Sequence, residues 1–133
     1  MAETFQFELV APEEVILSEA AEMVTVPGGD GDYGVLPRHA PMITTVRTGV
    51  LAVYENRQIR ERIFVAGGFA EVTPERLTVL AEEAVRLEGL ERSTVEQALK
   101  NAQDDLLDAQ DDAEKAMIEQ RIAIEQAKLK ALG

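Results

Sequence analysis

The sequence contains no cysteine, no tryptophan and a single histidine, His39, in 133 residues. Without cysteine, a disulfide framework, a thiol nucleophile and a cysteine-ligated metal site are all excluded, and this composition fits a reducing compartment. One histidine is too few for the usual zinc sites, which draw several ligands from histidine and cysteine. We therefore expect no metal and no cofactor. Only 5% of the residues are aromatic, so any core must be mainly aliphatic.

Basic residues are also scarce, with 13 Lys and Arg against 25 Asp and Glu and a net charge of −12. Because basic patches supply the affinity for nucleic acid, we expect no nucleic-acid partner. Anionic lipid headgroups repel such a protein, so we expect no direct lipid insertion. The charge favours a protein partner with a basic surface.

Long apolar runs are missing as well. No stretch approaches the roughly 18 apolar residues of a membrane span. The first ten residues lack both the basic and apolar regions of a signal peptide and the arginines of a transit peptide. We expect a protein that stays in a cytosol-like space and reaches a membrane only through a partner.

Apolar residues recur with period two through the first part of the sequence, up to Leu87. Phe5, Phe7 and Leu9 alternate with polar residues, and turn signals separate the later runs, including Gly67-Gly68. Many short strands without intervening helices predict an antiparallel β-sandwich over residues 1–87. The later runs are residues 15–17, 23–26, 42–46, 50–54, 63–66 and 77–80.

After Ser93 the period becomes helical. Residues 93–96, Ser-Thr-Val-Glu, match a capping box, which predicts a helix starting at Ser93. Apolar stripes at helical spacing, with a turn near residues 109–112, predict an antiparallel two-helix hairpin over residues 88–133. One uninterrupted helix of about 40 residues is an alternative, because no glycine or proline enforces the turn. The stripes are Val95, Ala98, Leu99, Ala102, Leu106 and Ala109, then Ala113, Ala116, Met117, Gln120, Ile124, Ala127 and Ala131.

Residue patterns typical of enzymes are few. Ser18 and Ser93 are not in a nucleophile-elbow context. Residues 28–34 are rich in glycine but lack the Gly-Lys-Ser/Thr ending of a phosphate loop, and Asp30 and Asp32 would repel phosphate. We expect no catalytic residues.

Residues 27–41, PGGDGDYGVLPRHAP, are the most distinctive segment. Glycines that tolerate positive φ and prolines that fix φ predict a rigid, irregular loop, and rigid loops often carry function. For His39 two interpretations stand: a loop residue bonded to its own backbone, or a contact residue at a protein interface. The residues expected to shape the loop are Gly28, Gly31, Gly34, Pro37 and Pro41.

This segment, with Thr44 and residues 49–51, resembles the G-x-x-G-x-L-P-x-H-A-P signature of the epsilon subunit of the F-type, proton-translocating ATP synthase. Residues 7–12, 64–72 and 79–84 are similar to further family segments, so the resemblance covers the whole sequence in order.

The resemblance implies a non-catalytic central-stalk subunit that turns with the rotor and couples proton translocation to ATP synthesis. It implies a sandwich of about ten strands bound to the gamma subunit and the ring of c subunits. The resemblance implies a regulatory hairpin with two positions: folded on the sandwich, or extended along gamma into the alpha/beta catalytic head, where it can block ATP hydrolysis. The implied location is peripheral, on the cytoplasmic side of a bacterial inner membrane. The implied c-ring contacts are Asp32, Tyr33, Arg38 and His39.

One departure concerns nucleotide. Some bacterial members bind ATP through an Ile/Leu-Asp-x-x-Arg-Ala pattern early in the first helix. Here Glu91 replaces the aspartate and Thr94 stands in place of the arginine, so we expect no ATP binding. The alternative function from another class is a free-standing β-sandwich that binds a small ligand under a helical lid.

Overall fold

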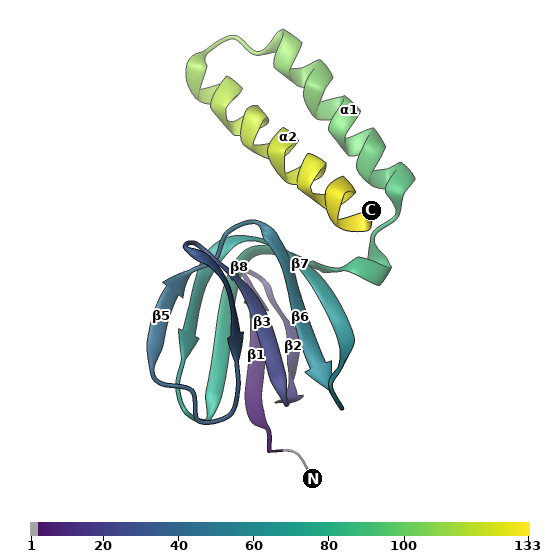
Figure 1. Cartoon of the computed structure of the whole chain (residues 1–133). Helices are drawn as coiled ribbons and strands as arrows, with labels where there is room; N and C mark the ends of the chain where they lie inside the picture. Colours follow the sequence, from purple (N-terminus) through teal and green to yellow (C-terminus); the bar gives the residue numbers. More distant parts are fainter. Residues whose placement is uncertain (1–2) are drawn as a thin grey trace. The chain divides into compact units, whose positions relative to one another are not determined.

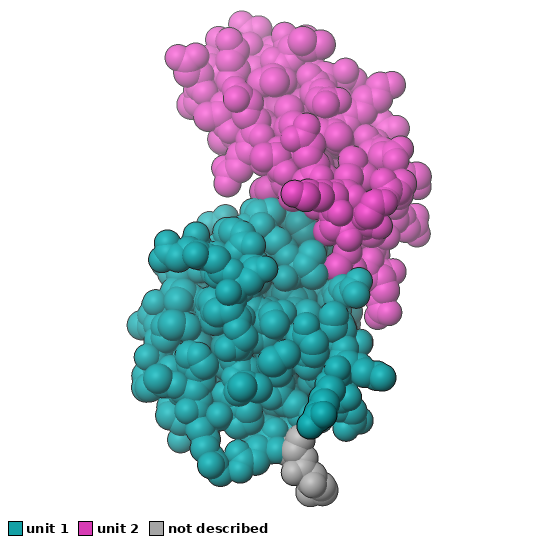
Figure 2. Space-filling view, in the orientation of Figure 1, with its two compact units in different colours: residues 1–86 teal, residues 87–133 magenta. Residues whose placement is uncertain are grey.

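The computed structural model describes residues 3–133, which divide into two compact units, Met1–Arg86 and Leu87–Gly133 (Figure 2). The first unit contains the strands and the second the helices (Figure 1). The predicted fold class, a β-sandwich followed by a two-helix hairpin, is confirmed.

Eight strands form the first unit within the described residues, and their turns lie where proline, glycine and asparagine occur. Their order in the sheet is β2-β1-β8-β7-β6-β3-β4, and β5 pairs with β7 outside this path. All pairings are antiparallel except the one between β1 and β8. The strands are β1 (Phe5–Ala11), β2 (Glu14–Ala21), β3 (Met23–Gly28), β4 (Gly31–Val35), β5 (Met42–Thr45), β6 (Gly49–Glu55), β7 (Gln58–Val72) and β8 (Arg76–Arg86).

Two long strands, β7 and β8, each take part in both layers of the sandwich. Residues 69–72 of β7 and 76–80 of β8 lie in one layer with β5, β1 and β2. Residues 63–65 of β7 and 83–86 of β8 lie in the other with β6, β3 and β4. The structure therefore has eight strands rather than about ten, because two strands supply a segment to each layer without interruption.

The bend in β7 is at Gly67 and Gly68, which have φ angles of 68° and 130°. Residues 63–66 before the bend are all buried, and of these Ile63 and Val65 belong to the core between the layers. After the bend the core residues are Ala70 and Val72. A Cβ on Gly68 would lie 1.9 Å from the carbonyl oxygen of Leu80. The expectation that Gly67-Gly68 separates two strands is wrong, since one strand runs through these glycines. Only glycine allows both the backbone angle and the close approach.

The core between the layers is aliphatic apart from two phenylalanines, as the composition requires. Its fully buried large members include Phe7, Leu9, Leu51 and Leu77, contributed by β1, β6 and β8. Along β1 the buried residues Phe7 and Leu9 alternate with half-buried ones, as expected for a strand with one buried face. At about 25 cal/mol per Å² of apolar area removed from water, this core supplies the main stabilisation of the sandwich.

The second unit is a helical hairpin with α1 (Arg92–Asp108) and α2 (Asp112–Leu132), preceded by the 3₁₀ turn η1 (Leu87–Gly89). The predicted turn is confirmed, and the single-helix alternative is wrong. Asp111 caps α2 by accepting a 2.7 Å bond from the backbone N–H of Glu114. This cap satisfies one of the free N–H groups at the helix start.

Two local predictions for the hairpin are wrong. The first helix starts at Arg92 with Glu91 as its N-cap and no side-chain cap bond, so Ser93 does not open a capping box. In α2, Met117 is 74% exposed rather than part of the packing stripe. Ile118, one position after Met117, is half-buried instead, and so is Ile122, one helical turn later. Alanine-rich sequence left the phase of this stripe poorly defined.

Replacing Gly68 by alanine is expected to destabilise the sandwich by about 2–4 kcal/mol, because a Cβ would collide with the Leu80 carbonyl at a positive φ. Urea unfolding followed by tyrosine fluorescence would measure this, since both tyrosines, Tyr33 and Tyr54, lie in the sandwich. The control is Gly34→Ala, where the nearest atom to a Cβ is the Met23 sulfur at 3.8 Å. Equal effects of the two substitutions would contradict the proposed reason.

Candidate functional site

The distinctive segment 27–41 is a β-hairpin followed by a short irregular stretch. Pro27 and Gly28 end β3, Gly29 and Asp30 make the turn, and β4 begins at Gly31. The prediction of an irregular loop throughout is therefore wrong for its first half. In this segment the residues with positive φ are Gly31, at 134°, and Arg38, at 67°.

The β3–β4 turn is fastened to the residues that follow β5. The backbone N–H of Gly29 donates to Thr45 O at 3.0 Å, and that of Arg47 donates to Pro27 O at 2.9 Å. The Arg47 guanidinium donates to Gly28 O at 2.7 Å and to Asp32 Oδ1 at 2.5 Å. Four hydrogen bonds thus hold the turn, within the segment that the sequence predicted to be a rigid loop.

A groove of about 610 Å³ lies between this turn and β5. The hydroxyl of Tyr33 on β4 and that of Thr44 on β5 share a hydrogen bond of 2.5 Å. Ile43 is 72% exposed, so an apolar side chain stands beside the polar ones. We call this the turn groove; it is lined by Gly28, Gly29, Asp30, Gly31, Asp32, Tyr33, His39, Met42, Ile43, Thr44 and Thr45.

Three of the four residues expected to make contacts line the turn groove: Asp32, Tyr33 and His39. Arg38 does not. Its guanidinium pairs with Glu3 at 2.5 Å, and its backbone N–H donates to Pro74 O at 2.8 Å. The ring Nδ1 of His39 lies 2.8 Å from the carbonyl oxygen of Ala40, which is the backbone-bonded arrangement.

An exposed apolar surface crosses the first layer of the sandwich, and the sequence patterns gave no sign of it. Phe69 pairs with Leu80, Leu80 with Val10, and Val10 with Val15, so their side chains share the outer face. Phe69, Leu80 and Val15 are 58%, 53% and 60% exposed. We call these four residues the apolar row. No local pattern could reveal it, because its members come from two strand pairs, β1–β2 and β7–β8, that lie far apart in the sequence.

The apolar row and the turn groove are neighbours. Thr45 lines the turn groove and is also the direct cross-strand partner of Phe69. Both are therefore parts of one continuous stretch of the sandwich surface. Such an arrangement is suited to binding protein, since apolar contacts and hydrogen-bonding groups lie side by side.

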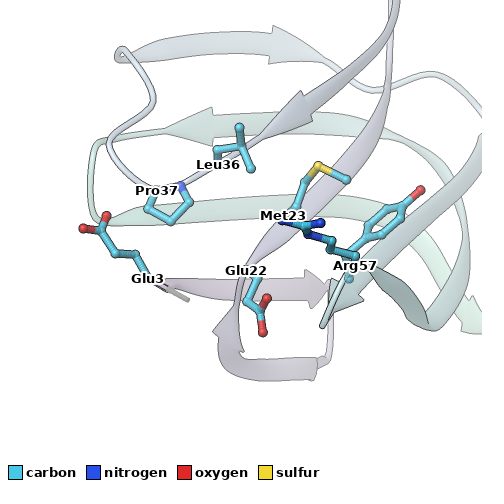
Figure 3. Close-up of a pocket in the computed structure, with 7 residues that line it drawn as sticks. Glu3, Glu22, Met23, Leu36, Pro37 and Arg57 are labelled. Atoms are coloured by element: carbon cyan, nitrogen blue, oxygen red, sulfur yellow. The ribbon is translucent and has the colours of Figure 1, made fainter. Parts of the chain in front are cut away.

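A second cleft, of about 470 Å³, has Met23, Leu36 and Pro37 in its lining (Figure 3). The carboxylates of Glu3 and Glu22 point away from each other in Figure 3, and both are engaged. That of Glu3 pairs with Arg38, and that of Glu22 accepts from the backbone N–H of Asn56 at 3.2 Å. A small-ligand site needs polar groups that converge on one point, and these diverge.

Two kinds of site are absent from residues 3–133. These residues contain no group of three or more His, Asp or Glu side chains placed to hold a metal ion. In the same range, neither helix combines the length and the apolar character needed to cross a bilayer.

The fold and the surface therefore define a class: a β-sandwich interaction module joined to a helical hairpin. Family models match both parts. Residues 4–87 match the family described as ATP synthase, Delta/Epsilon chain, beta-sandwich domain, and residues 91–133 match the family of the C-terminal domain of the ATP synthase epsilon chain.

Individual proteins similar to this chain point to the same family. The ATP synthase epsilon chain of Rhodospirillum rubrum is 53% identical over 131 residues, covering 98% of each protein. A chain in the structure of the Euglena gracilis mitochondrial ATP synthase, OSCP/F1/c-ring, has a TM-score of 0.79 at 26% identity, covering 98% of this chain and 82% of that one. A chain of the Tetrahymena thermophila mitochondrial ATP synthase central stalk/c-ring shares the fold, with a TM-score of 0.66 at 13% identity, covering 99% of this chain and 98% of that one.

The chain belongs to the family of ATP synthase epsilon chains, which are non-catalytic stalk subunits. The resemblance stated from the sequence is confirmed.

Removing the hydroxyl of Tyr33 is expected to cost about 1 kcal/mol of unfolding free energy, because Thr44 loses its bond across the turn groove. Tyr33→Phe, Thr44→Val and the double variant form a cycle that isolates this pair. Urea unfolding followed by the fluorescence of Tyr54 would measure it. Strictly additive effects would show that the hydroxyls do not interact.

Proposed function

We propose that this protein is a rotor subunit of the central stalk of an F-type ATP synthase and couples proton translocation to ATP synthesis. Family membership supports the proposal, as does likeness to a chain of an assembly that contains F1 and a c-ring. The observation that carries it is the adjacency of the apolar row and the turn groove through Thr45. A coupling subunit must bind two partners firmly at once, and two adjoining surfaces on a rigid sandwich provide for that.

The sandwich domain, residues 1–87, is the docking part. The apolar row is the surface proposed for the gamma subunit, since a row of exposed apolar side chains on paired strands gains free energy when a partner covers it. The turn groove is the surface proposed for the c-ring, with Asp32, Tyr33 and His39 as polar contacts and Arg38 at the edge of the loop. The subunit would be peripheral, on the cytoplasmic side of a bacterial inner membrane.

The hairpin domain, residues 88–133, is the proposed regulatory part. It would restrain ATP hydrolysis by reaching the alpha/beta head, but weakly. Basic residues would make such contacts, and residues 91–133 hold six of them against ten acidic residues. We keep the expectation that ATP is not bound, because Glu91 and Thr94 depart from the family pattern; in the structure Glu91 is the N-cap of α1.

A cysteine introduced by Asp32→Cys is expected to form a disulfide with a cysteine introduced into the polar loop of a c subunit in the assembled synthase, because Asp32 is exposed beside the turn groove. Immunoblotting of the oxidised complex would detect the product. The control is Arg57→Cys at the β6–β7 turn, which is exposed but does not line the groove. A c-subunit crosslink from Arg57→Cys with none from Asp32→Cys would overturn this orientation.

The double variant Phe69→Ser, Leu80→Ser is expected to weaken binding to isolated gamma subunit at least about tenfold, because each truncation removes apolar area from the interface. Its unfolding free energy should change little, since both side chains are more than half exposed. Ile59→Ser, on β7 outside the apolar row, is the matched control. Titration calorimetry would measure the affinities, and unchanged binding by the double variant would show that gamma docks elsewhere.

A further inference from the structure

Arg47 is the one side chain that bonds to both the backbone and a side chain of the β3–β4 hairpin within the described residues. Its guanidinium donates to Gly28 O and to Asp32 Oδ1, at 2.7 and 2.5 Å. We infer that Arg47 is a positioning residue: it holds the β3–β4 turn and the Asp32 carboxylate in the geometry that the c-ring meets. This inference rests on the proposed function, because it concerns the same contact surface.

The exposure of the Arg47–Asp32 ion pair shows that it acts on the geometry of the turn rather than on the stability of the fold. The side chains of Arg47 and Asp32 are 46% and 70% exposed. An ion pair that is so accessible to water adds little to the free energy of folding. Its effect is instead on geometry, since a planar guanidinium with two acceptors fixes their relative positions. The strand core beneath does not depend on it.

Besides the Arg47 side chain, two backbone hydrogen bonds restrain the turn, from Gly29 N–H to Thr45 O and from Arg47 N–H to Pro27 O. At Gly31, which has a φ of 134°, a Cβ would meet no atom within 4 Å, so this position faces open space. On the other side a Cβ on Gly29 would lie 2.2 Å from Thr45 Oγ1, so the turn sits directly against the end of β5. The backbone N–H of Arg47 donates to Pro27 O, which keeps Arg47 close to the contact between the turn and β5.

The clamp also sets the chemistry of the contact. Asp32 Oδ1 is taken by Arg47, so Oδ2 is the oxygen available to a donor on the partner. The partner therefore meets a neutral ion pair rather than an isolated carboxylate.

The first test uses the isolated full-length subunit. In Arg47→Gln the backbone N–H of Gly29 is expected to exchange with deuterium about tenfold faster, because the turn opens locally more often. The N–H of Val53 in β6 should keep its exchange rate, and so should Gly29 in Arg60→Gln, which removes ion pairs of the same kind to Glu19 and Glu55. Unchanged exchange at Gly29 in Arg47→Gln would overturn the inference.

The second test uses the assembled synthase carrying Asp30→Cys, an exposed turn position outside the hydrogen bonds of Arg47, together with the introduced cysteine in the c-subunit loop. Arg47→Gln is expected to lower the crosslinking yield to the c subunit about fivefold or more. Arg47→Lys should restore part of it, because the charge and one hydrogen bond can be kept. The amount of subunit bound to the complex should not change, since the apolar row is intact.

The outcomes distinguish the two proposals. If Asp30→Cys alone and Asp32→Cys alone both fail to crosslink to the c subunit, the ring contact is wrong, and the positioning of the turn stands or falls on the exchange experiment. If Asp30→Cys crosslinks equally well with arginine or glutamine at position 47, the ring contact holds and the role of Arg47 is overturned.

Discussion

The close approach of Gly68 to the Leu80 carbonyl is the constraint on which the sandwich depends. With a Cβ position only 1.9 Å from that oxygen, the bend that takes β7 from one layer to the other requires glycine. The bend lets β7 pair with β6 in its first half and β5 in its second. It therefore brings Thr45 beside Phe69, and the adjacency of the turn groove and the apolar row follows from this one backbone feature.

Side chains rather than strand pairing join β2 to the second layer. Arg60 on β7 pairs with Glu19 on β2 and, at 2.8 Å, with Glu55 on β6, while Arg86 reaches the carbonyl oxygen of Ile16 at 3.4 Å. The hydrogen bond to Glu55, with the two nearby carboxylates, raises the pKa of Arg60. These side-chain bonds of Arg60 and Arg86 connect β2 to the second layer without a further row of backbone hydrogen bonds.

The two parts of the protein illustrate different physical solutions. The sandwich gains its order from a buried aliphatic core and from glycines placed at close backbone contacts. That rigidity suits a docking surface, because little conformational entropy is lost when a partner binds. The hairpin has alanine-rich stripes and an interhelical turn capped by Asp111, so its stabilisation is modest. This difference supports the proposal that the sandwich binds the partners and the hairpin has the regulatory role.

The sequence by itself determined the fold class, the turn at Asp111, most strands and, by resemblance, the family. Glycine, proline and alternation are local signals, so the sequence also picked out the segment 27–41. The family resemblance added Asp32, Tyr33, Arg38 and His39 as expected contacts. Only the tertiary structure decided that β7 is one strand, that Arg38 lies outside the turn groove, that Arg47 bonds to the β3–β4 turn, and that the apolar row adjoins the turn groove. These features are made by residues far apart in sequence, and strand pairing, which no local pattern encodes, brings them together.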